Sequence, residues 1–157
     1  MSKPFILILC TGNSCRSQMA EGILRRELGD LADIASAGSR PAGFVHPTAV
    51  EVMREIGIDI SAAHSKSLAE FLDGRVTNVI TVCADADAAC PVFPGKVRRR
   101  HFGFDDPAKA VGDDASIKAE FRRVRDEINR VFAAYAAGLM DGVVTLGNTG
   151  RHGCESP

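Results

Sequence analysis

Cys10-Thr11-Gly12-Asn13-Ser14-Cys15-Arg16-Ser17 is the stretch of sequence that decides the fold. An uninterrupted apolar run, Phe5 to Leu9, comes before it, and apolar residues at helical spacing come after it, from Ala20 to Leu31. This order predicts a buried strand, a tight loop and a helix. The backbone N–H groups of such a loop and the positive end of the helix dipole point at one place. The sequence therefore predicts a cradle for an anion.

The side chains of this loop suit the chemistry of a tetrahedral oxyanion. Gly12 and Asn13 tolerate the backbone angles that a cradle needs, and the planar guanidinium of Arg16 fits two oxygens of the anion. Cys10 lies at the mouth, where a positive field favours the thiolate and makes it a nucleophile. The alternative is that Cys10 is an inert buried thiol at the end of a strand. We expect the rest of the loop to bind the anion as well: Thr11, Gly12, Asn13, Ser14, Cys15, Arg16 and Ser17.

The composition is that of an ordinary soluble protein. The chain has 157 residues, of which 45% are apolar and 25% charged, which suits one domain with its own core. A net charge of -1 gives no reason to expect nucleic acid or a membrane surface as a partner. The first residues have no long apolar segment, and five cysteines lack framework spacing, so we expect a thiol-bearing cytoplasmic protein. We place the domain at residues 1–137 and expect the polar, glycine-rich residues 138–157 to form a flexible tail.

Hydrophobic patterning predicts alternating strands and helices. Apolar or β-branched runs predict four strands, at residues 5–10, 32–37, 76–83 and 97–104. Helical spacing or capping residues predict the helix after the loop, one that Pro47 opens, a short one from Ser67 and a last one over 117–135. The order predicts an α/β fold, a single-domain four-stranded parallel sheet flanked by helices. Ligands of such sheets bind at the carboxyl ends of the strands, where Cys10 lies.

Two further cysteines stand where chemistry with Cys10 is plausible. Cys83 ends another strong strand, so it reaches the same edge of the sheet, and Cys90 follows seven residues later across the helix-prone run 84–89. In a helix these two residues are roughly 10 Å apart along the axis, whereas a disulfide needs Cα atoms about 4.4–6.8 Å apart. Pairing of the two thiols would therefore require the segment to unwind. The alternatives are ordinary core cysteines, or zinc ligands with Cys10 and Cys15, although the close Cys-x2–4-Cys spacing of zinc sites is missing.

A candidate general acid follows the fourth expected strand. When a thiolate attacks an oxyanion, the oxygen that is expelled leaves more readily with a proton. Asp106, held by Pro107, would supply that proton from a loop near the cradle. The alternative is that Asp105 and Asp106 cap a turn or helix, and one aspartate could serve each purpose.

Four motifs together resemble the thioredoxin-coupled arsenate reductases, a family built on the low-molecular-weight tyrosine phosphatase fold. The similarity runs in order from about residue 5 to residue 135. The motifs are Cys10 to Ser17, Ser36-Ala37-Gly38, Cys83 to Pro91, and His101-Phe102-Gly103-Phe104-Asp105-Asp106-Pro107.

The resemblance implies a three-thiol mechanism for the detoxification of arsenate. Cys10 would attack arsenate held by the loop and Arg16, and Asp106 would protonate the leaving hydroxyl. Cys83 would then attack Cys10 and release arsenite, and Cys90 would attack Cys83. Thioredoxin would reduce the resulting redox-active disulfide. Ser17 would support the Cys10 thiolate by hydrogen bonding, and Asn13 would shape the loop.

The resemblance also implies a cation site, from which this sequence departs. Some relatives bind potassium beside the loop through residues that match Asn13, Glu21, Ser36 and two further positions, here His64 and Lys66. We expect the Lys66 ammonium to replace the ion, so that the protein binds no metal, no potassium and no other cofactor. The alternative is that Lys66 is a solvated surface lysine.

Two other functions remain open from the sequence. A phosphatase would use Cys10, Arg16 and Asp106 to hydrolyse phosphate monoesters through a phosphocysteine, without Cys83 and Cys90. A redox sensor or anion-binding module would use the thiols without turnover. Phosphate and sulfate are expected to compete with arsenate in either case, and we expect a monomer. His46, His64 and Cys154, a stray thiol on the tail, receive no role.

Overall fold

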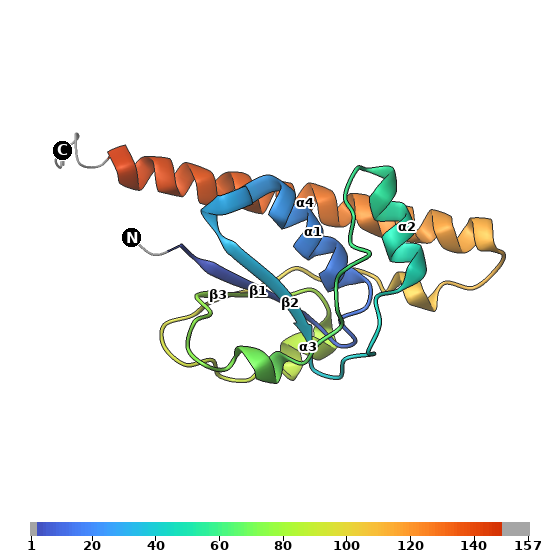
Figure 1. The fold of residues 1–157 in the computed structure, drawn as a ribbon, viewed down its shortest axis with the longest axis horizontal. Coiled ribbons are helices and arrows are strands. Elements are labelled where there is room, and N and C mark those ends of the chain that lie inside the picture. The colour runs from blue at the N-terminus through green and yellow to red at the C-terminus, as the bar shows by residue number, and fades with distance from the viewer. Residues whose placement is uncertain (1–2, 149–157) are drawn as a thin grey trace.

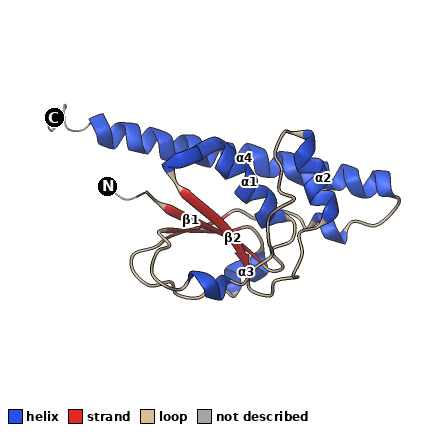
Figure 2. Cartoon of the chain, viewed as in Figure 1, coloured by secondary structure: helices blue, strands red, loops and turns tan. Residues whose placement is uncertain are grey.

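The computed structural model describes residues 3–148 of the chain. Four parallel strands form one sheet in the order β2-β1-β3-β4, with helices on both of its faces (Figures 1 and 2). The strands are β1 (Phe5–Cys10), β2 (Asp33–Gly38), β3 (Asn78–Thr81) and β4 (Arg98–His101). This arrangement confirms the expected α/β class and the four-stranded parallel sheet.

The helices divide between the two faces. Helices α1 and α4 pack on each other, α2 packs on α4, and α3 lies against β1 and β3 on the other side of the sheet (Figure 1). The bounds are α1 (Arg16–Leu28), α2 (Pro47–Glu55), α3 (Ala84–Ala88) and α4 (Asp114–Asn148), with 3-10 turns at Gly29–Leu31, Leu68–Phe71 and Pro107–Lys109. Among the residues that the structure describes, no helix combines the length and the apolar character needed to cross a membrane.

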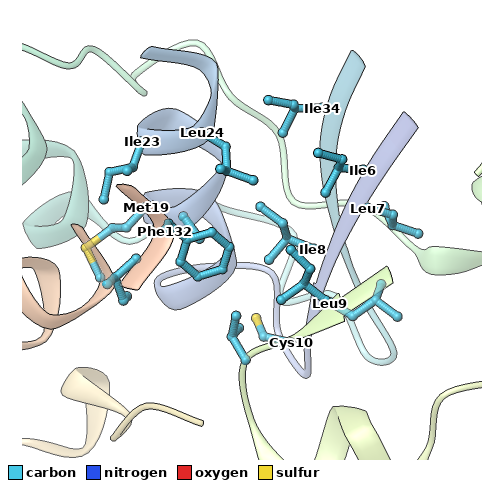
Figure 3. Packing of buried hydrophobic residues seen from close by; sticks show 14 of the residues in the cluster. Ile6, Leu7, Ile8, Leu9, Cys10, Met19, Ile23, Leu24, Ile34 and Phe132 are labelled. Carbon is cyan, nitrogen blue, oxygen red and sulfur yellow. The ribbon is translucent and has the colours of Figure 1, made fainter. Parts of the chain in front are cut away.

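Strand β1 lies in the centre of the sheet and forms the core. Ile6 to Leu9 are buried on both faces, which is why this run is apolar without alternation. Ile8 points towards α1 and Phe132 of α4, whereas Leu7 points to the other face of the sheet, and Cys10 lies at the end of the same strand (Figure 3). In the register, Cys10 stands opposite Gly38 and Leu9 stands opposite Thr81, so three strands end beside the 10–17 loop.

Two expected strands are shorter than predicted. Strand β3 covers 78–81 rather than 76–83, and β4 covers 98–101 rather than 97–104. Strand β4 is an edge strand whose four residues are all exposed; it pairs with β3, and its Arg99 and His101 side chains also make hydrogen bonds. Backbone hydrogen bonds continue past the ends of both strands, from Thr77 N to Phe5 O and from Phe102 N to Thr81 O, so the expected bounds include residues that flank the regular pairing.

The prediction that the last helix ends before Gly138 was wrong. Helix α4 continues to Asn148, and Leu139 and Met140 pack against the core beyond the glycine. A glycine costs a helix only about 1 kcal/mol relative to alanine, which tertiary packing offsets. Residues 149–157, the remainder of the expected tail with Cys154, lie outside the described part of the chain.

Candidate active site

Asn13 sets the shape of the loop that joins β1 to α1. It is the one non-glycine residue with a positive φ among the described residues, at 49°, and its side chain is fully buried. Its Nδ2 donates to Ser17 Oγ at 2.8 Å and to Ser36 Oγ at 2.9 Å. Its Oδ1 accepts from the backbone N–H of Lys66 at 3.0 Å and from Gln18 Nε2 at 3.1 Å. Because every polar atom of this amide is used, the strained backbone is fixed by the surrounding fold.

The Cys10 sulfur receives two hydrogen-bond contacts from this loop. The Asn13 backbone N–H donates to Cys10 Sγ at 3.1 Å, and Ser17 Oγ lies 3.0 Å from the same sulfur. Since Ser17 Oγ already accepts from the Asn13 amide, its own hydrogen is free to point at the sulfur. This geometry agrees with the role expected for Ser17, and both contacts are of the kind that a thiolate accepts.

Gly38, at the end of β2, lies against the loop. A Cβ atom at this position would be 2.5 Å from the Thr11 carbonyl oxygen and 3.1 Å from the Asn13 nitrogen. Two backbone hydrogen bonds join the residues after Gly38 to the loop. Ser39 N donates to Cys10 O at 3.2 Å, and Arg40 N donates to Thr11 O at 2.9 Å. The glycine of the Ser36-Ala37-Gly38 motif is therefore required by the close approach of two backbones.

Arg16 and Asp106 lie together on one side of the loop. Arg16 Nη2 is 3.6 Å from Asp106 Oδ2, and Arg16 Nη1 donates to the Phe104 carbonyl at 3.2 Å. The other Asp106 oxygen, Oδ1, accepts from the Ala108 backbone N–H at 3.0 Å and caps the turn that Pro107 opens. The structure thus brings the candidate acid to the Arg16 guanidinium, and the capping role left open by the sequence belongs to the same aspartate. Asp105 instead pairs with Arg123 at 2.9 Å.

Cys15 is buried within the loop and is kept as a thiol. Burial, together with the nearby charges of Asp106 and Cys10, raises the pKa of Cys15 to about 12, against smaller opposing effects of a hydrogen bond with Ser14 and of the Arg16 charge. At neutral pH a thiol with this pKa is not a nucleophile. Its place in the loop is therefore to fill space beside the anion site.

Cys83 lies next to the loop, as its place at the end of the third strand predicted. Its Sγ is 3.4 Å from Thr11 Oγ1, and Thr11 follows Cys10 directly. The same sulfur caps α3 by accepting from the Ala86 backbone N–H at 3.4 Å, so the positive end of the helix points at it.

Cys90 lies beyond the other end of α3 and is half-buried. Its Sγ contacts the Pro91 carbonyl at 3.7 Å. The helical pattern continues towards it, because Ala89 N donates to Asp85 O at 3.0 Å and Cys90 N donates to Asp87 O at 3.4 Å. The segment is therefore helical between the two cysteines, as expected, and the two thiols are kept apart.

The positions matched to a potassium site are largely engaged by protein groups. Asn13 and Ser36 are hydrogen-bonded to each other, and the Lys66 ammonium donates to the His64 carbonyl at 3.1 Å. Glu21 is buried and 3.7 Å from Arg25, with its Oε1 lacking a partner. Among the described residues, no ion pair joins Lys66 to Glu21, so the replacement of the ion by this ammonium stays a prediction.

Two residues without a predicted role support the loop. Gln18 Nε2 donates to Asn13 O at 3.2 Å and to the His64 carbonyl at 2.9 Å. His46 accepts from Thr48 N through Nδ1 at 3.1 Å and caps α2, and its backbone N–H donates to Ser14 O. Burial lowers the pKa of His46, against an opposing effect of the Asp106 charge. The place of His46 before Pro47 was a capping signal in the sequence, whereas nothing local marked Gln18.

Metal binding finds no support among residues 3–148. No group of three or more histidine, cysteine or acidic side chains in this part of the chain could hold a metal ion. The zinc alternative for the cysteines would have required such a group.

The sequence matches one protein family over most of its length. The profile of the family described as low molecular weight phosphotyrosine protein phosphatase matches residues 5–144. A relative from Halalkalibacterium halodurans, named arsenate reductase, is 50% identical over 136 residues, which are 87% of this chain and 97% of that protein. An arsenate reductase from Bacillus subtilis is 46% identical over the same shares of the two chains.

The chain is also similar in structure to solved arsenate reductases. One of an arsenate reductase in the oxidized state has a TM-score of 0.73 at 27% identity and covers 85% of this chain and 97% of that chain. One of an arsenate reductase in the phosphate binding state has a TM-score of 0.68 at 28% identity and covers 86% of this chain and 98% of that chain. An arginine phosphatase from Geobacillus stearothermophilus, with a TM-score of 0.74 at 24% identity over 90% and 96% of the two chains, shares the fold.

Proposed function

Since the chain belongs to the low molecular weight phosphotyrosine protein phosphatase family, we propose that it binds a tetrahedral oxyanion in the 10–17 loop and reduces arsenate to arsenite. The curated relatives named arsenate reductase, about half identical over most of the chain, support arsenate as the substrate. The reaction would serve arsenic detoxification.

The first step forms a bond between the Cys10 sulfur and arsenic. Backbone N–H groups and Arg16 hold the anion, and the Cys10 thiolate displaces one of its oxygens. Asp106 donates the proton with which that oxygen leaves as water. In the structure, Arg16 contacts Asp106 and the Phe104 carbonyl. A bound anion would replace some of these contacts of the guanidinium.

The second step transfers two electrons to arsenic. The Cys83 sulfur attacks the Cys10 sulfur, the S–As bond breaks, and its electron pair remains on arsenic as arsenite leaves. In the third step, the Cys90 thiolate attacks the Cys83 sulfur of the Cys10–Cys83 disulfide. A Cys83–Cys90 disulfide forms and Cys10 departs as a thiolate. The dithiol of thioredoxin then supplies two electrons and returns the enzyme to its starting state.

The contact between Cys83 Sγ and Thr11 Oγ1 is the observation that carries this proposal. It puts a second thiol at the edge of the anion cradle, where a hydrolase needs none. The oxidation state of arsenic changes by two electrons, and the formation of one disulfide supplies them.

Phosphatase activity is the second candidate, because the cradle and the acid do not depend on the identity of the central atom. The neighbouring arsenate reductase structure in the phosphate binding state supports phosphate as a competing ligand. This activity would need Cys10, Arg16 and Asp106 but neither Cys83 nor Cys90.

A coupled assay separates the two functions. Arsenate-dependent NADPH oxidation, with thioredoxin and thioredoxin reductase, is measured for the wild type and for Cys10→Ser, Cys83→Ser and Cys90→Ser, with Cys154→Ser as the matched control. We expect multiple turnovers in the wild type and the control, and at least about a thousandfold loss in each of the other three variants. Phosphate ester hydrolysis without arsenate turnover, unchanged in the Cys83 and Cys90 variants, would show a phosphatase instead.

Further proposals concern the surroundings of the enzyme. We propose that it acts as a cytoplasmic monomer, with thioredoxin as reductant and without a potassium ion. The engagement of Asn13 and Ser36 by protein groups, and the position of Lys66 beside the His64 carbonyl, support the last point. Equal rates in potassium and sodium chloride at one ionic strength are expected, and faster turnover in potassium would refute it. Light scattering tests the monomer.

A further inference from the structure

The helix between the two redox cysteines is tied to the sheet by a chain of three side chains. Thr81 Oγ1 donates to Asp87 Oδ1 at 2.9 Å, and His101 Nδ1 lies 2.8 Å from the same hydroxyl. A hydroxyl has a single hydrogen and an ionised carboxylate only accepts. The Thr81 hydrogen is thus directed at Asp87, and His101 must carry the Nδ1 hydrogen that it donates to Thr81. Asp87 belongs to α3, whereas its two partners belong to β3 and β4.

A second contact holds the end of the same segment. Arg99 Nη2 donates to the Cys90 carbonyl at 3.3 Å and to the Pro91 carbonyl at 3.2 Å. Arg99 and His101 are two residues apart on β4 and therefore project from the same face of the sheet. Arg98 lies on the alternate face, where it lines a cavity on the α4 side.

These contacts cannot survive the formation of a Cys83–Cys90 disulfide. While the backbone between the two residues is helical, they are roughly 10 Å apart along the axis, which exceeds the reach of a disulfide. The bond requires α3 to unwind, and unwinding displaces Asp87 from Thr81 and the Cys90 carbonyl from Arg99. The contacts therefore belong to the dithiol form alone.

We propose that Thr81, Asp87, His101 and Arg99 form a clamp that stabilises the dithiol form and thereby sets the reduction potential of the Cys83–Cys90 pair. The clamp also opposes the third step of the relay, in which the Cys90 thiolate attacks Cys83 and Cys10 leaves as a thiolate. This inference rests on the proposed function. The four residues touch neither substrate nor the reacting sulfurs, so they are positioning residues.

The clamp has a measurable effect on the redox equilibrium. A contact present only in the dithiol form makes the disulfide easier to reduce, so the loss of the contact lowers the reduction potential. Asp87 and His101 are partly exposed, and water replaces some of what is lost. A hydrogen bond of this kind corresponds to about a fivefold change in the equilibrium constant. For a two-electron couple this fivefold change is a shift of about 20 mV.

A redox titration tests the clamp on the full chain. The Cys83–Cys90 pair is equilibrated with glutathione buffers in a Cys10→Ser, Cys154→Ser background. We expect Thr81→Val, which removes the hydroxyl and keeps the shape, to lower the potential by about 20 mV. Thr81→Ser, which restores the hydroxyl, should return the potential to the background value. A contact that persisted in both redox forms would leave the potential unchanged in all of these variants.

Arg99 offers a second test with its own control. Arg99→Gln should lower the potential in the same direction, by a smaller amount because the contact is exposed. Arg98→Gln removes an equal charge from the alternate face of the same strand and should leave the potential unchanged. Equal shifts in the two variants would show a general charge effect and would contradict a role of Arg99 in the clamp.

Amide exchange gives a readout that needs no disulfide. In the reduced protein, the amides of residues 86–90 should exchange about fivefold faster in Thr81→Val than in the wild type, whereas those of β1 should not change. Equal exchange at 86–90 would overturn the clamp even if the relay operates. Failure of the wild type to form a Cys83–Cys90 disulfide would overturn the relay itself and the redox role of the clamp with it.

Discussion

At the scale of single residues, the catalytic loop depends on the absence of a side chain at Gly38. A Cβ atom there would lie 2.5 Å from the Thr11 carbonyl oxygen, so Gly38→Ala must displace the backbone of the loop. We expect kcat/KM for arsenate to fall by about a hundredfold, because small displacements of a nucleophile have effects of this size. Gly142→Ala, in open space on α4, is the control and should leave the rate unchanged. A Gly38→Ala enzyme within twofold of the wild type would contradict this reading.

Cys15 of the loop should be protected from alkylation by its burial. Because burial is the main cause that raises the pKa of Cys15 to about 12, its thiolate fraction at pH 8 is roughly a thousandfold below that of an ordinary thiol. In the folded protein, iodoacetamide should therefore leave Cys15 unmodified, as peptide mass spectrometry can show. Unfolding in urea should make Cys15 react. Alkylation of Cys15 in the folded protein at the unfolded rate would disprove the protective effect of burial.

At the scale of elements, replacing two helix glycines with alanine should change the free energy of unfolding in opposite directions. Gly138 lies inside α4 and Gly29 ends α1 with φ at 52°, and neither has an atom within 4 Å of an added Cβ. Gly138→Ala should raise the free energy of unfolding by up to about 1 kcal/mol, and Gly29→Ala should lower it by about 1 kcal/mol, because only Gly29 needs a left-handed backbone. Urea denaturation measures both. A stabilising Gly29→Ala would contradict the assigned conformation.

At the scale of the whole molecule, an anion bound to the cradle should stabilise the fold. The loop joins β1 to α1, and the ends of β2 and β3 lie beside it, so its occupation couples to the entire sheet. Phosphate at about a hundred times its dissociation constant should add about 2.7 kcal/mol to the free energy of unfolding. Calorimetry with increasing phosphate measures the effect. Arg16→Ala should abolish most of it, whereas Arg98→Ala, at an exposed site on the edge strand, should not.

Several features could be predicted because they are local in the sequence. The apolar run before Cys10, the glycine and asparagine of the loop and the helical spacing that follows it specify β1, the cradle and α1 together. The β-branched run before Cys83 likewise predicted a strand ending at the same edge of the sheet. Local patterning predicts the candidate nucleophile, its guanidinium partner Arg16 and the second thiol.

Tertiary structure decided the features that depend on partners distant in the chain. Local propensity placed the end of the last helix at Gly138, but packing of Leu139 against the core carries α4 further. Asn13 and Ser36 are 23 positions apart, and Thr81 and His101 are 20 positions apart. No short-range sequence pattern predicts these two contacts. Sequence periodicity reports which residues share a face of one element. Only the assembled sheet brings the ends of separate strands within hydrogen-bond distance. For this reason the sequence by itself predicted the candidate reacting groups, whereas the contacts that position them came from the tertiary structure alone.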